Sequence, residues 1–180
     1  TDDSDPTTLD LSATAGVAEG GSIVYTATLS NAAQTPLTVT LSTGQTIAIA
    51  AGATSGSVTI AAPAEDVYVD AGSVSRSITA TSGGNFENLQ LGTMSATTAV
   101  SDTIDVTTVS ITGSSTVAEG ATASYTVSLT SPAQTAVSVN LTYSGTAADG
   151  SDYTGVASVT IPAGASSASF NVATLQDVIG

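Results

Sequence analysis

An internal repeat of 100 residues is the feature that most constrains this chain. Between residues 17 and 41, 12 of the 25 amino acids recur 100 positions later without a gap. A repeat of this length indicates homologous domains placed in tandem. We therefore expect a first domain over residues 1–105 and a second, homologous domain over residues 106–180.

The hydrophobic pattern within each repeat predicts β-strands. Apolar residues occupy alternate positions, as in Ile23, Tyr25, Ala27 and Leu29, which is typical of a strand with one buried face. No segment has the periodicity of a helix. The pattern predicts seven strands in the first domain, over 7–13, 22–30, 37–41, 46–50, 57–60, 74–81 and 89–100, the last with a phase shift near Gly92.

Seven short strands predict an all-β fold of tandem immunoglobulin-like antiparallel β-sandwiches. The second domain repeats the first three strands, carries an insertion of 12 residues before the fourth, and has no counterpart of the last two. Its faces around Tyr125, Leu141 and Phe170 are therefore expected to be exposed. A monomer is expected, with neighbouring repeats of the same chain as its partners.

The charge balance excludes several function classes. Fifteen acidic residues against one basic residue give a net charge of −14, so the clustered cations that bind nucleic acid are missing. No apolar run reaches the length of a membrane helix, and we expect no direct insertion into a membrane. The chain has no His, Cys or Lys and offers no pairing of nucleophile and base, so we do not expect an enzyme.

The one basic residue, Arg76, falls in phase with Val74 and Ile78 on a predicted strand. This position directs it toward the core side. We expect its side chain to extend toward nearby carboxylates and form a structural ion pair.

The order of the strands predicts where the carboxylates gather. Successive antiparallel strands reverse direction, so alternate loops and the exit from the last strand lie at one end of the sandwich. In the first domain those positions hold Glu19, Glu65, Asp66, Asp70, Asp102 and Asp105. Asp102 and Asp105 also repeat the pair formed by Asp2 and Asp5, which places carboxylates at each boundary between repeats.

A cluster of carboxylates without basic neighbours favours a bound cation. Oxygen ligands in the absence of His and Cys point to Ca²⁺ rather than a transition metal. We expect Glu19, Asp66, Asp102 and Asp105 to form most of the site, with Glu65 and Asp70 as neighbouring ligands. The alternative is that these loops are simply solvated.

The second domain resembles the Calx-beta family. The resemblance rests on Val117-Ala118-Glu119-Gly120, Tyr125-Thr126-Val127-Ser128-Leu129, Ser151-Asp152-Tyr153 and Ile161-Pro162-Ala163-Gly164. It implies a Calx-beta-like sandwich that binds calcium at one end. Carried over to this chain, the ligands would be Glu119, Asp152 and Asp177.

The first domain resembles the tandem extender repeats of giant RTX adhesins that Gram-negative bacteria export by type I secretion. The residues concerned are Asp66-Val67-Tyr68, Gly83-Gly84-Asn85-Phe86-Glu87 and Val100-Ser101-Asp102-Thr103-Ile104-Asp105. The resemblance implies a secreted, calcium-stiffened spacer at the bacterial cell surface that serves adhesion and biofilm formation, with an unknown receptor. Two alternatives stay open: a module that itself binds a glycan or cell-surface protein, and an accessory domain of a secreted enzyme.

Overall fold

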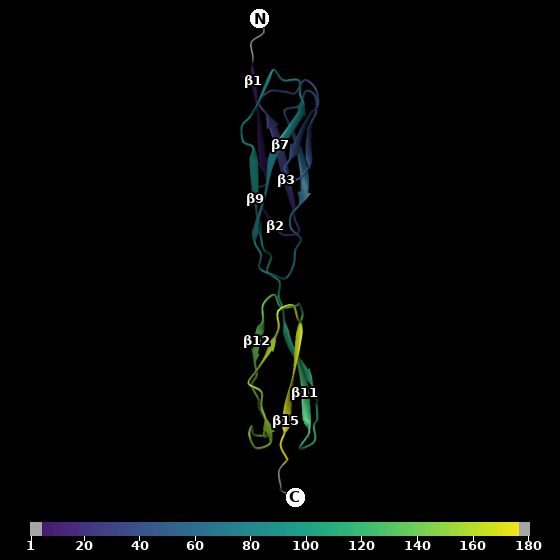
Figure 1. The fold of residues 1–180 in the computed structure, drawn as a ribbon, viewed down its shortest axis with the longest axis vertical. Coiled ribbons are helices and arrows are strands. Elements are labelled where there is room, and N and C mark those ends of the chain that lie inside the picture. The colour runs from purple at the N-terminus through teal and green to yellow at the C-terminus, as the bar shows by residue number, and fades with distance from the viewer. Residues whose placement is uncertain (1–4, 177–180) are drawn as a thin grey trace. The chain divides into compact units, whose positions relative to one another are not determined.

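The structure is a computed structural model that describes residues 5–176. It divides into two compact units, Thr1–Ile104 and Asp105–Gly180, named unit 1 and unit 2. Every regular element among the described residues is a β-strand (Figure 1). The same residues include no helix long and apolar enough to cross a membrane. The prediction of an all-β fold is confirmed.

Unit 1 is a sandwich of two sheets. One sheet has the order β6-β3-β1-β8, formed by Ser55–Ala61, Ser22–Leu29, Pro6–Ala13 and Asn88–Leu91. The other has the order β2-β9-β7-β4-β5, formed by Gly16–Ala18, Ser95–Ser101, Gly72–Gly83, Leu37–Leu41 and Thr46–Ile49. Alternate apolar residues from both sheets make one buried core, as in an immunoglobulin-like sandwich.

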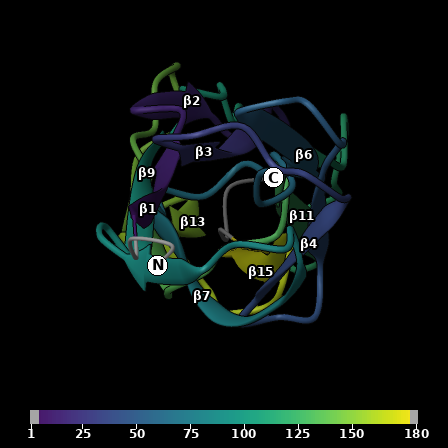
Figure 2. The same ribbon diagram turned by 90° about the horizontal axis from the view of Figure 1, so that it is seen from above.

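The first and last strands of unit 1 each change from one sheet to the other. The chain crosses after β1 to form β2, and it crosses again after β8 to form β9. As a result β1 pairs in parallel with β8, and β2 pairs in parallel with β9, while the remaining pairs are antiparallel. Figures 1 and 2 show β9 beside β1. In each sheet, a strand from the start of unit 1 is thus hydrogen-bonded to a strand from its end.

The second crossing corrects the prediction of one bulged strand over 89–100. At Gly92 the chain passes beside β1, and a Cβ atom there would meet the carboxylate of Asp10. The amide of Gly92 donates to the carbonyl of Leu9 at 3.0 Å, and the amide of Thr93 donates to Asp10 at 2.6 Å. The phase shift in the sequence therefore marks a change of sheet, for which glycine provides the space.

Tyr25 is the largest fully buried side chain of unit 1. Its ring lies in the core, and its hydroxyl donates a hydrogen bond of 3.1 Å to the carbonyl of Val74 on β7. One residue of β3 therefore links the two sheets by both packing and a hydrogen bond.

Arg76 does not form the predicted ion pair with the carboxylates. It lies within β7 opposite Ala96, and its Nη1 donates to the carbonyl of Ser75 at 2.8 Å. Its Nε is buried without a hydrogen-bond partner. The described residues contain no carboxylate in ion-pair contact with it, because its position in the strand fixes the side chain among backbone groups of the sheet.

Unit 2 repeats the first half of unit 1. Its larger sheet has the order β10-β11-β15-β13, and a second sheet pairs β12 with β14. These strands are Val109–Gly113, Thr122–Leu129, Ser167–Thr174, Tyr153–Thr154, Val137–Asn140 and Ser158–Ile161. β10 pairs with β11 as β1 pairs with β3, each partner 100 residues later. The predicted insertion lies between β12 and β14 and contributes the short strand β13.

Candidate metal centre

Glu19 lies in the turn that follows β2. The parallel register of β2 and β9 ends at Ala18 opposite Ser101, and the amide of Glu19 donates to the Ser101 carbonyl at 3.0 Å. Gly20, with a φ of 69°, turns the chain toward β3, and its amide donates to the carbonyl of Pro63 at 2.7 Å. These backbone contacts hold the Glu19 side chain at the end of the sandwich.

Asp102 and Asp70 reach the same end from two neighbouring strands. Asp102 is the first residue after β9. Extending the parallel register of β2 with β9 by one residue places Asp102 opposite Glu19. β7 and β9 are antiparallel, with Gly72 opposite Val100, and extending this register by two residues places Asp70 opposite Asp102. Three adjacent strands, in the order β2-β9-β7, thus each bring one carboxylate to the end of the sheet.

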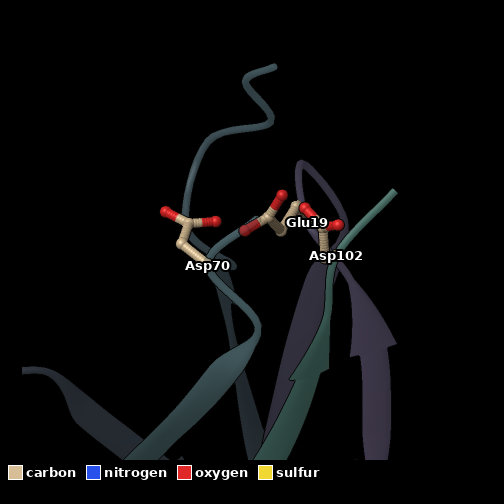
Figure 3. Close-up of side chains that lie close together, drawn as sticks. All are labelled: Glu19, Asp70 and Asp102. Atoms are coloured by element: carbon tan, nitrogen blue, oxygen red, sulfur yellow. The ribbon is translucent and has the colours of Figure 1, made fainter. Parts of the chain in front are cut away.

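The three carboxylates converge. One oxygen from each of Glu19, Asp70 and Asp102 lies within 4.8 Å of the other two, and Figure 3 shows the Glu19 side chain between the other two. Calcium lies about 2.4 Å from its oxygen ligands, so two oxygens on one ion are separated by at most about 4.8 Å. The donor set and its spacing therefore fit a calcium ion.

Two carboxylate oxygens of these residues are buried without a hydrogen-bond partner. Glu19 is only 6% exposed, and both its Oε2 and the Oδ1 of Asp102 are unpartnered. Buried polar atoms nearly always have a partner, and a buried carboxylate without one is costly. Their arrangement is the one expected of ligands that face a cation.

The electrostatics of the cluster raise the pKa of Glu19 from 4.5 to about 7. The largest cause is a hydrogen bond with the Asp70 side chain, in which Glu19 keeps its proton. Burial acts in the same direction, as do the negative charges of Asp70, Asp102 and Asp66. In the absence of a cation, the cluster therefore takes up a proton near neutral pH.

The other carboxylates predicted for this end lie around the cluster. Asp66 is close enough to raise the pKa of Glu19, but its Oδ1 accepts a hydrogen bond of 2.8 Å from the amide of Tyr68. Glu65 accepts a hydrogen bond of 2.7 Å from the Thr103 hydroxyl. Asp105 is exposed and belongs to unit 2. The structure thus brings Asp70, expected as a neighbour, into the centre.

None of the carboxylates predicted as ligands in unit 2 belongs to a group of three neighbouring acidic residues in the described part of the chain. Glu119 is exposed, and Asp152 accepts a hydrogen bond of 2.6 Å from the amide of Ala148. Asp177 lies outside the described residues. The prediction also omitted Asp149, which accepts a hydrogen bond of 2.8 Å from the amide of Gly155. Among residues 5–176, Glu19, Asp70 and Asp102 form the one such group of three.

Comparison with known proteins gives a family match that follows the repeat. A family model described as "LapA domain" matches residues 5–103 and again residues 105–179. Among solved structures, the chain is similar to the "Crystal structure of CBD12 from CALX1.2", with 15% sequence identity and a TM-score of 0.44, over 96% of this chain and 76% of that chain. No curated protein matches the chain.

Proposed function

Because the chain belongs to the LapA domain family, we propose that it is a non-enzymatic extender segment of a bacterial cell-surface adhesin, stiffened by calcium. In this function the repeated sandwiches are spacers that hold ligand-binding regions of the adhesin away from the cell. Calcium is bound at the end of unit 1 by Glu19, Asp70 and Asp102. The family membership supports the adhesin, and the carboxylate cluster supports the ion.

The observation that carries the calcium proposal is the pair of buried, unpartnered oxygens, Oε2 of Glu19 and Oδ1 of Asp102. Neither a basic side chain nor a backbone amide satisfies them among the described residues. A hard cation with oxygen ligands satisfies both and removes the repulsion between the carboxylates. Extracellular calcium modules bind with dissociation constants of about 10⁻⁴ to 10⁻³ M, which suits a protein at the cell surface.

The stiffening follows from what the three ligands hold. Glu19 belongs to the turn after β2, Asp70 to the loop before β7, and Asp102 to the segment after β9. An ion bound by all three would fix that last segment to the body of unit 1. Since the chain continues from there into unit 2, the ion would restrict the motion of the connection.

A calcium titration of the full chain, followed by calorimetry, tests the proposal. We expect saturable binding that Glu19→Gln and Asp102→Asn each weaken by about tenfold or more. Glu87→Gln is the matched control, because Glu87 is an exposed carboxylate beside β8, at the other end of the sandwich. Unchanged calcium affinity in both Glu19→Gln and Asp102→Asn would refute this site. Glu87→Gln weakening calcium binding as much as they do would refute it as well.

A second candidate function is glycan binding, and one feature of unit 1 favours it. A hollow of about 490 Å³ lies at the end of unit 1 that carries the loop between β7 and β8. Amides and carboxylates line it beside Phe86, namely Asn31, Gln34, Asn85, Asp5 and Glu87. Such groups and one aromatic ring suit sugar hydroxyls. A glycan array probed with the full chain and with Asn85→Ala tests this candidate.

A further inference from the structure

Gly21, at the end of the turn that carries Glu19, has no space for a side chain. A Cβ atom there would lie 2.5 Å from a methyl group of Val17 and 2.9 Å from the carbonyl oxygen of Ala18. Both distances are shorter than van der Waals contact allows. Gly21 is not among the residues with a positive φ, so this position requires glycine for space and not for backbone conformation.

The residues on both sides of Gly21 are fixed by the sheets. The carbonyl of Gly21 accepts a hydrogen bond of 3.0 Å from the amide of Ala62, which continues the pairing of β3 with β6. Val17 lies opposite Val100 in the pairing of β2 with β9 and packs against the core, and its branched side chain has few rotamers available. A methyl group added at position 21 must therefore be accommodated by the turn between them, where Glu19 lies two residues from each.

The turn by itself accepts a side chain at this position. In unit 2 the position of Gly21 is occupied by Ala121, whose amide donates to the carbonyl three residues earlier at 3.1 Å. The amide of Gly21 does the same at 3.1 Å, and the residue before it has a φ of 69° in unit 1 and 73° in unit 2. The two turns thus have the same conformation with and without a Cβ atom. The obstacle in unit 1 is therefore the methyl group of Val17.

We propose that Gly21 is a positioning residue of the cation site. The absence of a Cβ atom lets Val17 pair with β9 directly beside the turn, and this pairing holds Glu19 opposite Asp102. Gly21 itself makes no contact with the ion and acts through the position of Glu19. The effect on calcium rests on the proposed function, whereas the effect on the position of Glu19 does not.

Calcium titrations of the full chain by calorimetry test the proposal. Gly21→Ala should weaken calcium binding by about tenfold or more, the usual effect of disturbing a residue that orients a metal ligand. Gly16→Ala is the matched control, because Gly16 also belongs to β2 and a Cβ atom there would lie 3.7 Å from the carbonyl oxygen of Ala99, an ordinary contact. This control should change the affinity by less than about twofold.

A second substitution should restore the site. Val17→Ala removes the obstructing methyl group, so Val17→Ala combined with Gly21→Ala should bind calcium within about threefold of Val17→Ala alone. A general loss of stability would not produce this rescue, because Val17→Ala also removes a contact with the core and would add to the damage. Additive losses of calcium affinity in the double variant would overturn the proposal.

Hydrogen exchange without calcium tests the position of Glu19 directly. The amide of Glu19, which donates to the carbonyl of Ser101, should exchange about tenfold faster in Gly21→Ala than in the wild type or Gly16→Ala. The amides of β3 and β6 should keep their protection in all three. Unchanged exchange at Glu19 would overturn the proposal. Loss of protection throughout β3 and β6 would overturn it too, because Gly21 would then serve the fold of the whole unit.

The two measurements separate this proposal from the calcium site on which it builds. If the wild type binds no calcium, the proposed function is wrong, and exchange at the Glu19 amide still decides whether Gly21 positions that residue. If the wild type binds calcium and Gly21→Ala binds it equally well, the calcium site stands and the role of Gly21 is refuted.

Discussion

The backbone amide of Glu19 donates a hydrogen bond of 3.0 Å to the carbonyl of Ser101, the residue directly before Asp102. Two carboxylates 83 positions apart in the sequence are thereby held beside each other by main-chain geometry. Because the backbone sets this arrangement, replacing a side chain of the cluster should change cation binding without disturbing the strands. The first predictions depend on this independence of the strands from the side chains of the cluster.

Calcium should raise the stability of unit 1. At a calcium concentration one hundred times the dissociation constant, a single bound ion adds about 2.7 kcal/mol to the free energy of unfolding. Thermal unfolding of the wild type should shift upward with calcium and return with chelator, while Glu19→Gln should show little shift. If Glu19→Gln responds to calcium as the wild type and Glu87→Gln do, the cluster is a solvated surface.

The raised pKa of Glu19 gives a pH dependence with a definite sign. Its folded pKa of about 7 exceeds its ordinary value of 4.5, so without calcium its contribution to stability is complete below about pH 4.5 and is lost as pH rises through about 7. Protons and calcium compete for the same oxygens. Calcium affinity should therefore be roughly tenfold weaker at about pH 6 than at about pH 8. Calorimetry at the two pH values measures this, and a flat profile would contradict it.

The two units should differ in hydrogen exchange. Unit 1 buries Leu9 and Leu11, whereas the equivalent Val109 and Ile111 of unit 2 are half exposed, so unit 2 loses apolar burial worth several kcal/mol. Amides of β10 and β12 should exchange much faster than those of β1 and β4 in the isolated chain. Equal protection factors in the paired strands would show that unit 2 is closed by other means.

The paired tyrosines provide a test of one hydrogen bond. Tyr25→Phe removes the hydroxyl that donates to the carbonyl of Val74 and should lower the free energy of unfolding of unit 1 by about 1 kcal/mol. Tyr125→Phe should change the free energy of unfolding of unit 2 by much less, because within residues 5–176 its hydroxyl has no hydrogen-bond partner to lose. Denaturant unfolding of both variants, followed in each unit by hydrogen exchange, compares them. Equal losses would contradict the assignment.

Calcium should also narrow the range of lengths that the chain adopts in solution. The ion would hold the segment after β9, through which unit 1 is joined to unit 2. Small-angle scattering with chelator should give a broader distance distribution than scattering with calcium. Asp102→Asn combined with Asp105→Asn should reproduce the broad distribution even when calcium is present. If the wild type gives the same distribution with calcium and with chelator, calcium does not stiffen the chain.

Much of this fold follows from the sequence, because a period of two identifies strands and a repeat identifies equivalent strands. The alternation around Tyr25 predicts β3, and the repeat correctly carries it to β11. A period of two indicates which side chains are buried but not which sheet a strand joins. The crossing at Gly92 and the short strand β2 were therefore missed.

The sequence alone predicted at which end of the sandwich the candidate site lies. Strand direction placed Glu19 and Asp102 together, and the structure does bring them together. The choice between Asp66 and Asp70 was not accessible, because the loop that carries them has no periodicity. It depends on the register of β7 with β9, which puts Asp70 opposite Asp102 and leaves Asp66 to cap its own turn at Tyr68.

The parallel pairing of β2 with β9 has a mechanical consequence for a spacer. In the proposed function, tension would pull the N-terminal and C-terminal ends of unit 1 in opposite directions. β2 follows the first strand of unit 1, β9 is its last strand, and the two run side by side in parallel. The hydrogen bonds from Gly16 opposite Ala99 to Ala18 opposite Ser101 are therefore loaded in shear and must break together, rather than one after another as in unzipping. Glu19 and Asp102 are the next residues along the same two strands. A cation bound by both would cross-link the strands at the C-terminal end of β9, where the tension would be applied.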